Sequence, residues 1–124
     1  MGIKIMLDRG AIAALERAAL PAAKEAAEAL KTEVQNAAVM PFDTGDMQNN
    51  ETFVASSRGK EQVAATLVTG SPQARRLYYH PEYHFQQGHN AGAGGLWLEP
   101  WIDGEERDFV RDAFVRKYRE RAGL

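Results

Sequence analysis

Residues 23–38 have the sequence Ala23-Lys-Glu-Ala-Ala-Glu-Ala-Leu-Lys-Thr-Glu-Val-Gln-Asn-Ala-Ala38, in which small apolar side chains recur three or four positions apart. This spacing is typical of one face of an amphipathic helix, and the lysines and glutamates between them fall on the opposite face. The apolar stripe is mostly alanine, so it buries little area but lets another helix or a sheet approach closely. The segment therefore predicts a helix that depends on docking for its stability.

The residues before this segment continue the helical pattern with one interruption. Residues 11–20 are rich in alanine and leucine, which are strong helix formers. Pro21 lacks a backbone N–H, so it either opens a second helix or kinks one continuous helix. Further upstream, residues 3–7 begin with alternating apolar and polar side chains, as a short strand does, and Asp8 can cap the following helix.

A turn and a hairpin are expected after the helix. Pro41 disfavours helix at the preceding residue, and Asp43, Thr44 and Gly45 have turn chemistry, with Gly45 free to adopt positive φ. Two strand-like runs follow at residues 52–56 and 62–69, and the four residues 57–60 between them indicate an antiparallel hairpin.

The second half of the chain mixes strand, loop and helix signals. Residues 75–80 favour a strand that Pro81 ends, and residues 84–95 form a long glycine-rich loop. Asp103 and Glu106 have the spacing of a capping box for a last helix, which Gly123 can close. We therefore expect a single α+β domain over residues 1–124, with N-terminal long helices and a C-terminal helix packed on a small, mainly antiparallel β-sheet.

Composition excludes several classes of protein. The chain has 124 residues and no cysteine, so it forms neither disulfides nor thiolate metal sites. No apolar run is long enough to span a bilayer or to serve as a signal peptide, so no membrane partner is expected. A nucleic-acid-binding module could use Arg75, Arg76 and the C-terminal helix, but the net charge of −2 argues against this function.

The three histidines offer one candidate catalytic site. His80, His84 and His89 fall within ten residues, and Glu82 lies among them as a further ligand for a metal-dependent hydrolase. A surface loop with several polar aromatic side chains explains the same residues, and it is favoured because no His-Glu-x-x-His motif is present. Since no nucleophile motif or phosphate-binding loop stands out either, we expect no enzyme activity, no cofactor and no metal.

Aromatic and arginine residues gather in one segment, which we interpret as a candidate interface. Tyrosine, tryptophan and arginine are enriched at interface hot spots, although some of these aromatics can equally fill the core. The candidate interface residues are Arg75, Arg76, Tyr78, Tyr79, His80, Tyr83, His84, Phe85, His89 and Trp97.

The ordered motifs resemble those of the minor capsid proteins of tailed phages and prophages, related to the head–tail joining and tail-completion proteins of long-tailed phages. Pro41-Phe-Asp43-Thr44-Gly45-Asp46-Met47 is similar to their Pro-x-Asp-Thr-Gly-x-Leu turn, with Met47 in place of leucine. Tyr78 and Tyr79 resemble their tyrosine-bearing strand, and Pro100 resembles their proline before the last helix. The long stretch at residues 84–95 departs from the short Glu-Phe-Gly-Thr segment of these proteins.

This resemblance implies a structural protein of the virion, assembled in the bacterial host cytoplasm. It implies a homo-oligomeric ring at the neck, where identical subunits contact each other, the capsid-side connector or portal protein, and tail proteins. DNA passes through such a ring without sequence-specific contact. A ring of this kind uses a heterologous interface, in which one patch meets a different patch of the neighbour.

Overall fold

The computed structural model describes residues 9–43, 45–59 and 62–124. A long N-terminal helix, a C-terminal helix and a small antiparallel sheet confirm the expected α+β fold. The predicted strand at residues 3–7 and the cap at Asp8 lie outside the described residues. The elements are α1 (Arg9–Asn36), α2 (Asp46–Asn49), β1 (Thr52–Arg58), β2 (Val63–Thr69), α3 (Ala74–Tyr78), α4 (Glu99–Ile102) and α5 (Phe109–Ala122).

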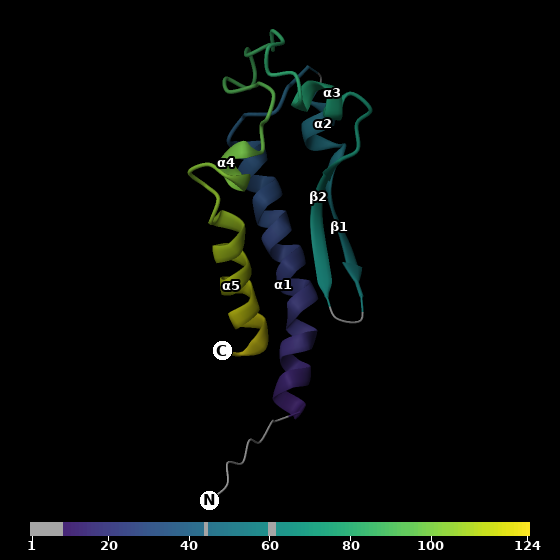
Figure 1. Ribbon diagram of the computed structural model, residues 1–124, viewed down its shortest axis with the longest axis vertical. Coiled ribbons are helices and arrows are strands. Elements are labelled where there is room, and N and C mark those ends of the chain that lie inside the picture. Colours follow the sequence, from purple (N-terminus) through teal and green to yellow (C-terminus); the bar gives the residue numbers. More distant parts are fainter. Residues whose placement is uncertain (1–8, 44, 60–61) are drawn as a thin grey trace, which may run out of the picture.

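Helix α1 is the axis around which the molecule is built. It is continuous and contains Pro21, which settles the open question in favour of one helix. An interior proline costs about 3 kcal/mol, so burial on neighbouring elements must offset that penalty. The hairpin and α5 pack on different sides of α1 (Figure 1). The buried α1 side chains are Ala18, Ala22, Ala26, Ala27 and Val34, which confirms the middle of the predicted alanine stripe as a docking surface and extends it toward the N-terminus. Ala37 at its other end is exposed, because the helix ends at Asn36.

Strands β1 and β2 form the predicted hairpin. Their register is unbroken from Thr52↔Thr69 to Arg58↔Val63, so β1 runs two residues past the expected end at 56 and β2 begins one residue later than expected. Directly opposed residues share a face of the sheet. Thr52 is only 3% exposed, and its Oγ1 donates to the carbonyl oxygen of Met47 at 2.6 Å. The face that carries Thr52 is therefore the one that packs inward.

The hydrophobic core lies at the end of α1 where the short helices gather. Its buried residues come from α1, α2, α3, α4 and the segments beside these helices, so the core joins the four helices to one another (Figure 1). Leu67 of β2 and Phe109 of α5 pack against it from either side. The buried core residues are Val34, Met40, Met47, Ala74, Trp97 and Trp101.

The predicted turn before the hairpin depends on Gly45. This glycine has φ +88°, and a Cβ at its position would lie 2.7 Å from Cζ of Phe42. The left-handed conformation and the close ring both favour glycine here. Gly45 precedes α2, whose residues Met47 and Gln48 are buried. The turn prediction for Gly45 is thus confirmed, whereas Thr44 lies outside the described residues.

The strand predicted at residues 75–80, which the phage-protein resemblance also implied, is wrong. The chain forms helix α3 there, beginning where the N–H of Ala74 donates to the carbonyl oxygen of Ser71 at 3.1 Å. Ala74, Leu77 and Tyr78 are spaced three and four positions apart, so one helical face presents all three to the core. This packing outweighs the β preference of the tyrosines.

The predicted start of the last helix at Asp103 is also wrong. The N–H of Asp103 donates to the carbonyl oxygen of Glu99 at 3.0 Å and ends α4. The backbone then packs so tightly that a Cβ on Gly104 would lie 2.6 Å from Cα of Pro100. Helix α5 begins only at Phe109, after Asp108, and it ends as predicted at Gly123 with φ +74°.

Candidate assembly surface

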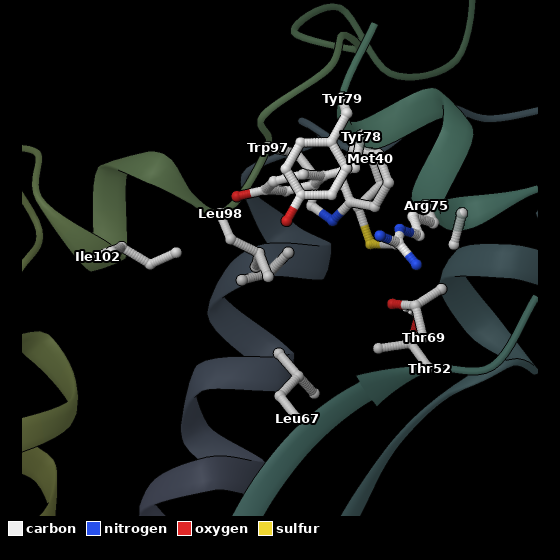
Figure 2. A pocket seen from close by; sticks show the side chains of 12 residues that line it. Met40, Thr52, Leu67, Thr69, Arg75, Tyr78, Tyr79, Trp97, Leu98 and Ile102 are labelled. Atoms are coloured by element: carbon white, nitrogen blue, oxygen red, sulfur yellow. Dashed lines mark hydrogen bonds between the residues drawn. The ribbon is translucent and has the colours of Figure 1, made fainter.

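An apolar groove opens where α1, β2, α3 and the segment leading into α4 meet. It has a volume of about 460 Å³, and most of its walls are hydrocarbon or aromatic (Figure 2). Tyr79 and Ile102 are 65% and 61% exposed at its rim. Large apolar side chains that remain exposed around one apolar groove are typical of a protein interaction site. The lining residues are Val34, Met40, Thr52, Leu67, Thr69, Ala74, Arg75, Tyr78, Tyr79, Trp97, Leu98 and Ile102.

Three aromatic rings make the upper wall of this groove. Tyr78 contacts Trp97 edge-to-face, with ring centroids 4.8 Å apart, and Tyr79 contacts Tyr78 in the same way at 5.1 Å. Trp97 is 5% exposed, so it belongs to the core, although it also lines the groove. Exposure thus increases along the stack from Trp97 to Tyr79, and Tyr79 is the ring that a partner can cover.

Tyr78 stays protonated over the neutral pH range. Burial raises the pKa of its hydroxyl above the ordinary value of 10.0, and the negative charge of Glu99 raises it further. The side chain therefore acts in the wall as a neutral aromatic group.

Arg75 and Arg76 are the basic groups of this region. Both are exposed on α3, and neither forms an ion pair within the part of the chain that the structure describes. Arg75 lines the groove, and in Figure 2 its guanidinium lies on the same side as Thr69. An unpaired arginine beside an apolar groove gives a partner a place for a carboxylate.

Comparison of the chain with protein-family models, with curated proteins and with solved structures found no match.

The glycine-rich loop is fastened to the helical core by Asn90, which is 2% exposed. Its Nδ2 donates to the carbonyl oxygen of Met40 at 2.9 Å and to Oε1 of Gln48 at 2.7 Å. The N–H of Gly92 adds a backbone bond to the carbonyl oxygen of Ala38 at 3.0 Å. The loop expected over residues 84–95 is therefore present, but its centre is held inside the fold.

The three histidines do not converge. Nδ1 of His80 lies 2.6 Å from Oε1 of Glu82, and the His80 ring stacks on Tyr83 at 4.7 Å. His89 instead stacks on Phe42 at 3.8 Å. Among the described residues no three carboxylate or histidine side chains are placed to hold a metal ion. The geometry gives no support to the metal-dependent hydrolase considered from the sequence.

The remaining candidate interface residues lie around the loop. His84 is exposed and Phe85 is half-buried, and both line a separate polar hollow beside the Gly45 turn. Tyr83 is 41% exposed and lies 6.5 Å from Phe85, measured between ring centroids. The structure thus places four of the ten candidates, Arg75, Tyr78, Tyr79 and Trp97, in the groove and five in a loop set around residues 80–89, whereas Arg76 is exposed on α3 outside both. Whether either set meets a partner stays a prediction.

Eight of the twelve residues that line the groove were not among the candidate interface residues, and Ile102 and Leu67 show why. Ile102 lies beside Trp101 in an apolar run, which was a visible signal, but its exposure depends on the unpredicted helix α4. Leu67 was assigned to the hairpin, yet its contact with the core around Val34 depends on how the sheet docks on α1. Within the described residues, no helix is long and apolar enough to cross a membrane.

Proposed function

We propose that this protein is a structural assembly subunit, a ring-forming head–tail connector in the neck of a tailed phage or prophage. The observation that carries the assembly role is the open apolar groove with Tyr79 and Ile102 exposed at its rim. A small domain that leaves such residues uncovered favours a partner that buries them.

The chemistry of the groove suits protein recognition better than catalysis. Its lining supplies aromatic area and one arginine, which are the side chains that dominate interface hot spots. A catalytic site needs a nucleophile or base held within hydrogen-bonding distance of an orienting partner. The groove offers Tyr78, which is neutral, and the hydroxyls of Thr52 and Thr69, which lie 3.1 Å apart and can bond each other.

The resemblance supplies the place of assembly. Similarity to phage minor capsid proteins through the turn from Pro41 to Met47 and through Pro100 supports a position in the neck of the virion, whereas Tyr78 and Tyr79 lend no support because they are not in a strand. The partners would be further copies of this chain, the portal-side connector and tail proteins, with assembly in the bacterial cytoplasm. DNA would pass through the ring, and the acidic net charge of −2 suits a surface that does not hold it.

Mass measurement tests this proposal directly. Purified protein is examined over a range of concentrations by light scattering after size exclusion and by native mass spectrometry, alone and mixed with portal-side and tail proteins. We expect a closed oligomer of fixed stoichiometry, visible as rings by electron microscopy. A chain that stays monomeric at every concentration and binds neither class of protein would contradict the proposed function.

A further inference from the structure

The sheet has two strands within the described residues, which leaves one edge of each strand without a backbone partner there. Unpaired N–H and C=O groups along an edge strand are a template for pairing with another chain. A two-stranded hairpin is also marginal in isolation and gains from a third strand.

The hydrogen bonds at the two ends of the hairpin show which residues direct their backbone N–H and C=O groups toward the free edges. The N–H of Gly70 donates to the carbonyl oxygen of Glu51, and the N–H of Gly59 donates to that of Gln62, both at 2.8 Å. Bonded and non-bonded pairs alternate along an antiparallel ladder. In the printed register, the non-bonded pairs direct their N–H and C=O groups to the free edges: Thr52↔Thr69, Val54↔Leu67, Ser56↔Ala65 and Arg58↔Val63.

Both strands lack the features that usually protect an edge. Neither contains a proline, the register has no bulge, and Arg58 at one end is their single charged residue. Natural edge strands are commonly blocked by lysine, proline or a bulge. The residues on the outward face, such as Phe53, Ala55 and Thr66, are also uncharged, and these three are exposed. A neighbouring strand would meet no charge repulsion here.

The two edges lie beside surfaces of opposite charge. The groove that contains Leu67 and Thr69 of β2 also borders α4. On α4 and the turn after it, four acidic residues that have no ion pair within the described chain outnumber Arg75, the basic residue of the groove lining: Glu99, Asp103, Glu105 and Glu106. Arg58, at the end of β1, lines a different hollow with Lys24, Lys117 and Arg121. Arg121 pairs with Glu25 and Lys117 with Glu120, so Arg58 and Lys24 against Glu28 leave this hollow with a small positive excess. Charge complementarity therefore favours a contact in which the β2 side of one copy packs against the β1 side of another.

We propose that the free edge of β2 pairs with the free edge of β1 from a second copy of this chain, so that hairpins join into a continuous intermolecular sheet. Because the two edges differ, each contact is heterologous, and repetition generates a closed ring or an open filament. The inference rests on the proposed ring-forming function and names the contact that builds the ring.

Proline substitutions at edge-directed N–H groups test the contact. Ala65→Pro and Ser56→Pro each remove an N–H that points away from the other strand, so the hydrogen bonds within the hairpin remain. Ala65→Val and Ser56→Thr keep that N–H and serve as matched controls. We expect the proline variants to remain folded, as judged by cooperative melting. The protein concentration at which half of the chains are assembled should rise about tenfold or more in these variants, whereas the controls should assemble like wild type. Unchanged assembly of both folded proline variants overturns the inference.

Cysteine pairing gives an answer even if a proline variant does not fold. The chain has no cysteine, so Ser56→Cys and Ala65→Cys subunits can be mixed and treated with a short bis-maleimide. Its reach must stay below about 9 Å, because identical strands of successive copies would lie two strand spacings, roughly 9.6 Å, apart. Covalent dimers should form in the mixture and not in either variant alone. Dimers within a single variant overturn head-to-tail pairing, and absence of dimers in an assembled mixture overturns edge contact.

These outcomes separate the inference from the proposed function. A wild-type ring that proline does not disturb leaves the neck function standing and removes the edge contact. If the wild-type protein forms filaments of unlimited length and the proline substitutions disrupt them, the edge contact is supported and the proposed ring is contradicted. A wild-type chain that is monomeric throughout removes both.

Discussion

The side-chain amide of Asn90 donates to the carbonyl oxygen of Met40 at 2.9 Å across a separation of 50 positions. The same nitrogen donates to Oε1 of Gln48 at 2.7 Å. A single buried side chain therefore provides hydrogen bonds both to the backbone just after α1 and to a side chain of the short helix α2. The glycine-rich loop is attached to the fold through this residue.

Replacement of Asn90 should destabilise the whole domain. In Asn90→Ala the carbonyl of Met40 and the amide of Gln48 lose a buried donor, and each unsatisfied group costs about 1–3 kcal/mol. We expect a lower midpoint in urea denaturation, with an unchanged slope. Gln86→Ala, an exposed change in the same loop, is the control. Equal stability of the two variants would show that the Asn90 bonds do not support the fold.

Gly45→Ala should cost more than an ordinary glycine replacement. Its φ of +88° and the Phe42 ring at 2.7 Å from the new Cβ both oppose a side chain, so we expect a loss of at least about 1–2 kcal/mol in the free energy of unfolding. Gly88→Ala is the matched control, because a Cβ there meets nothing within 4 Å and φ is not positive. The same loss of stability in both variants would refute the conformational argument.

Local pattern predicted the parts of this fold that depend on local chemistry. The alanine spacing located α1, two strand-like runs separated by four residues located the hairpin, and the Asp-Thr-Gly signature located the left-handed turn at Gly45. Each is a property of neighbouring residues. The role of Asn90 was not predictable in this way, because an asparagine in a loop gives no sign of a partner 50 positions earlier.

The misassigned segment at residues 75–80 has a related cause. Tyrosines favour strands on average, but the spacing of Ala74, Leu77 and Tyr78 suits a helix, and docking on the core decided between the two. The same helix turns adjacent tyrosines in different directions. Sequence alone could nominate Tyr79 and Trp97 together as interface residues, yet only the fold shows that the first is exposed and the second buried.

Alkaline pH should weaken the fold through Tyr78. Its pKa in the folded chain is raised above 10.0, so above pH 10 the unfolded chain releases the tyrosine proton while the folded chain retains it. The folded state then binds more protons, and the free energy of unfolding falls as pH rises until Tyr78 also ionises. Tyr78→Phe should show a smaller fall between pH 9 and 11 when denaturation curves are compared with wild type, each referred to its own value at pH 7. An identical fall would show that burial of this hydroxyl does not contribute.

Tyr79 and Trp97 should separate assembly from stability. Trp97→Ala empties a core position that is 5% exposed, so we expect a loss of about 3–5 kcal/mol, seen as early melting before any assembly is measured. Tyr79→Ala removes a ring that is 65% exposed and contacts Tyr78 at its edge, so its loss should stay below about 1 kcal/mol. If the groove meets a partner, Tyr79→Ala will melt nearly like wild type and yet fail to form the oligomer under conditions where wild type assembles. Val115→Ala, which trims a half-exposed apolar side chain on α5 outside the groove lining and the hairpin, is the control for loss of surface apolar area. Normal assembly of Tyr79→Ala would exclude the groove rim from the contact between subunits.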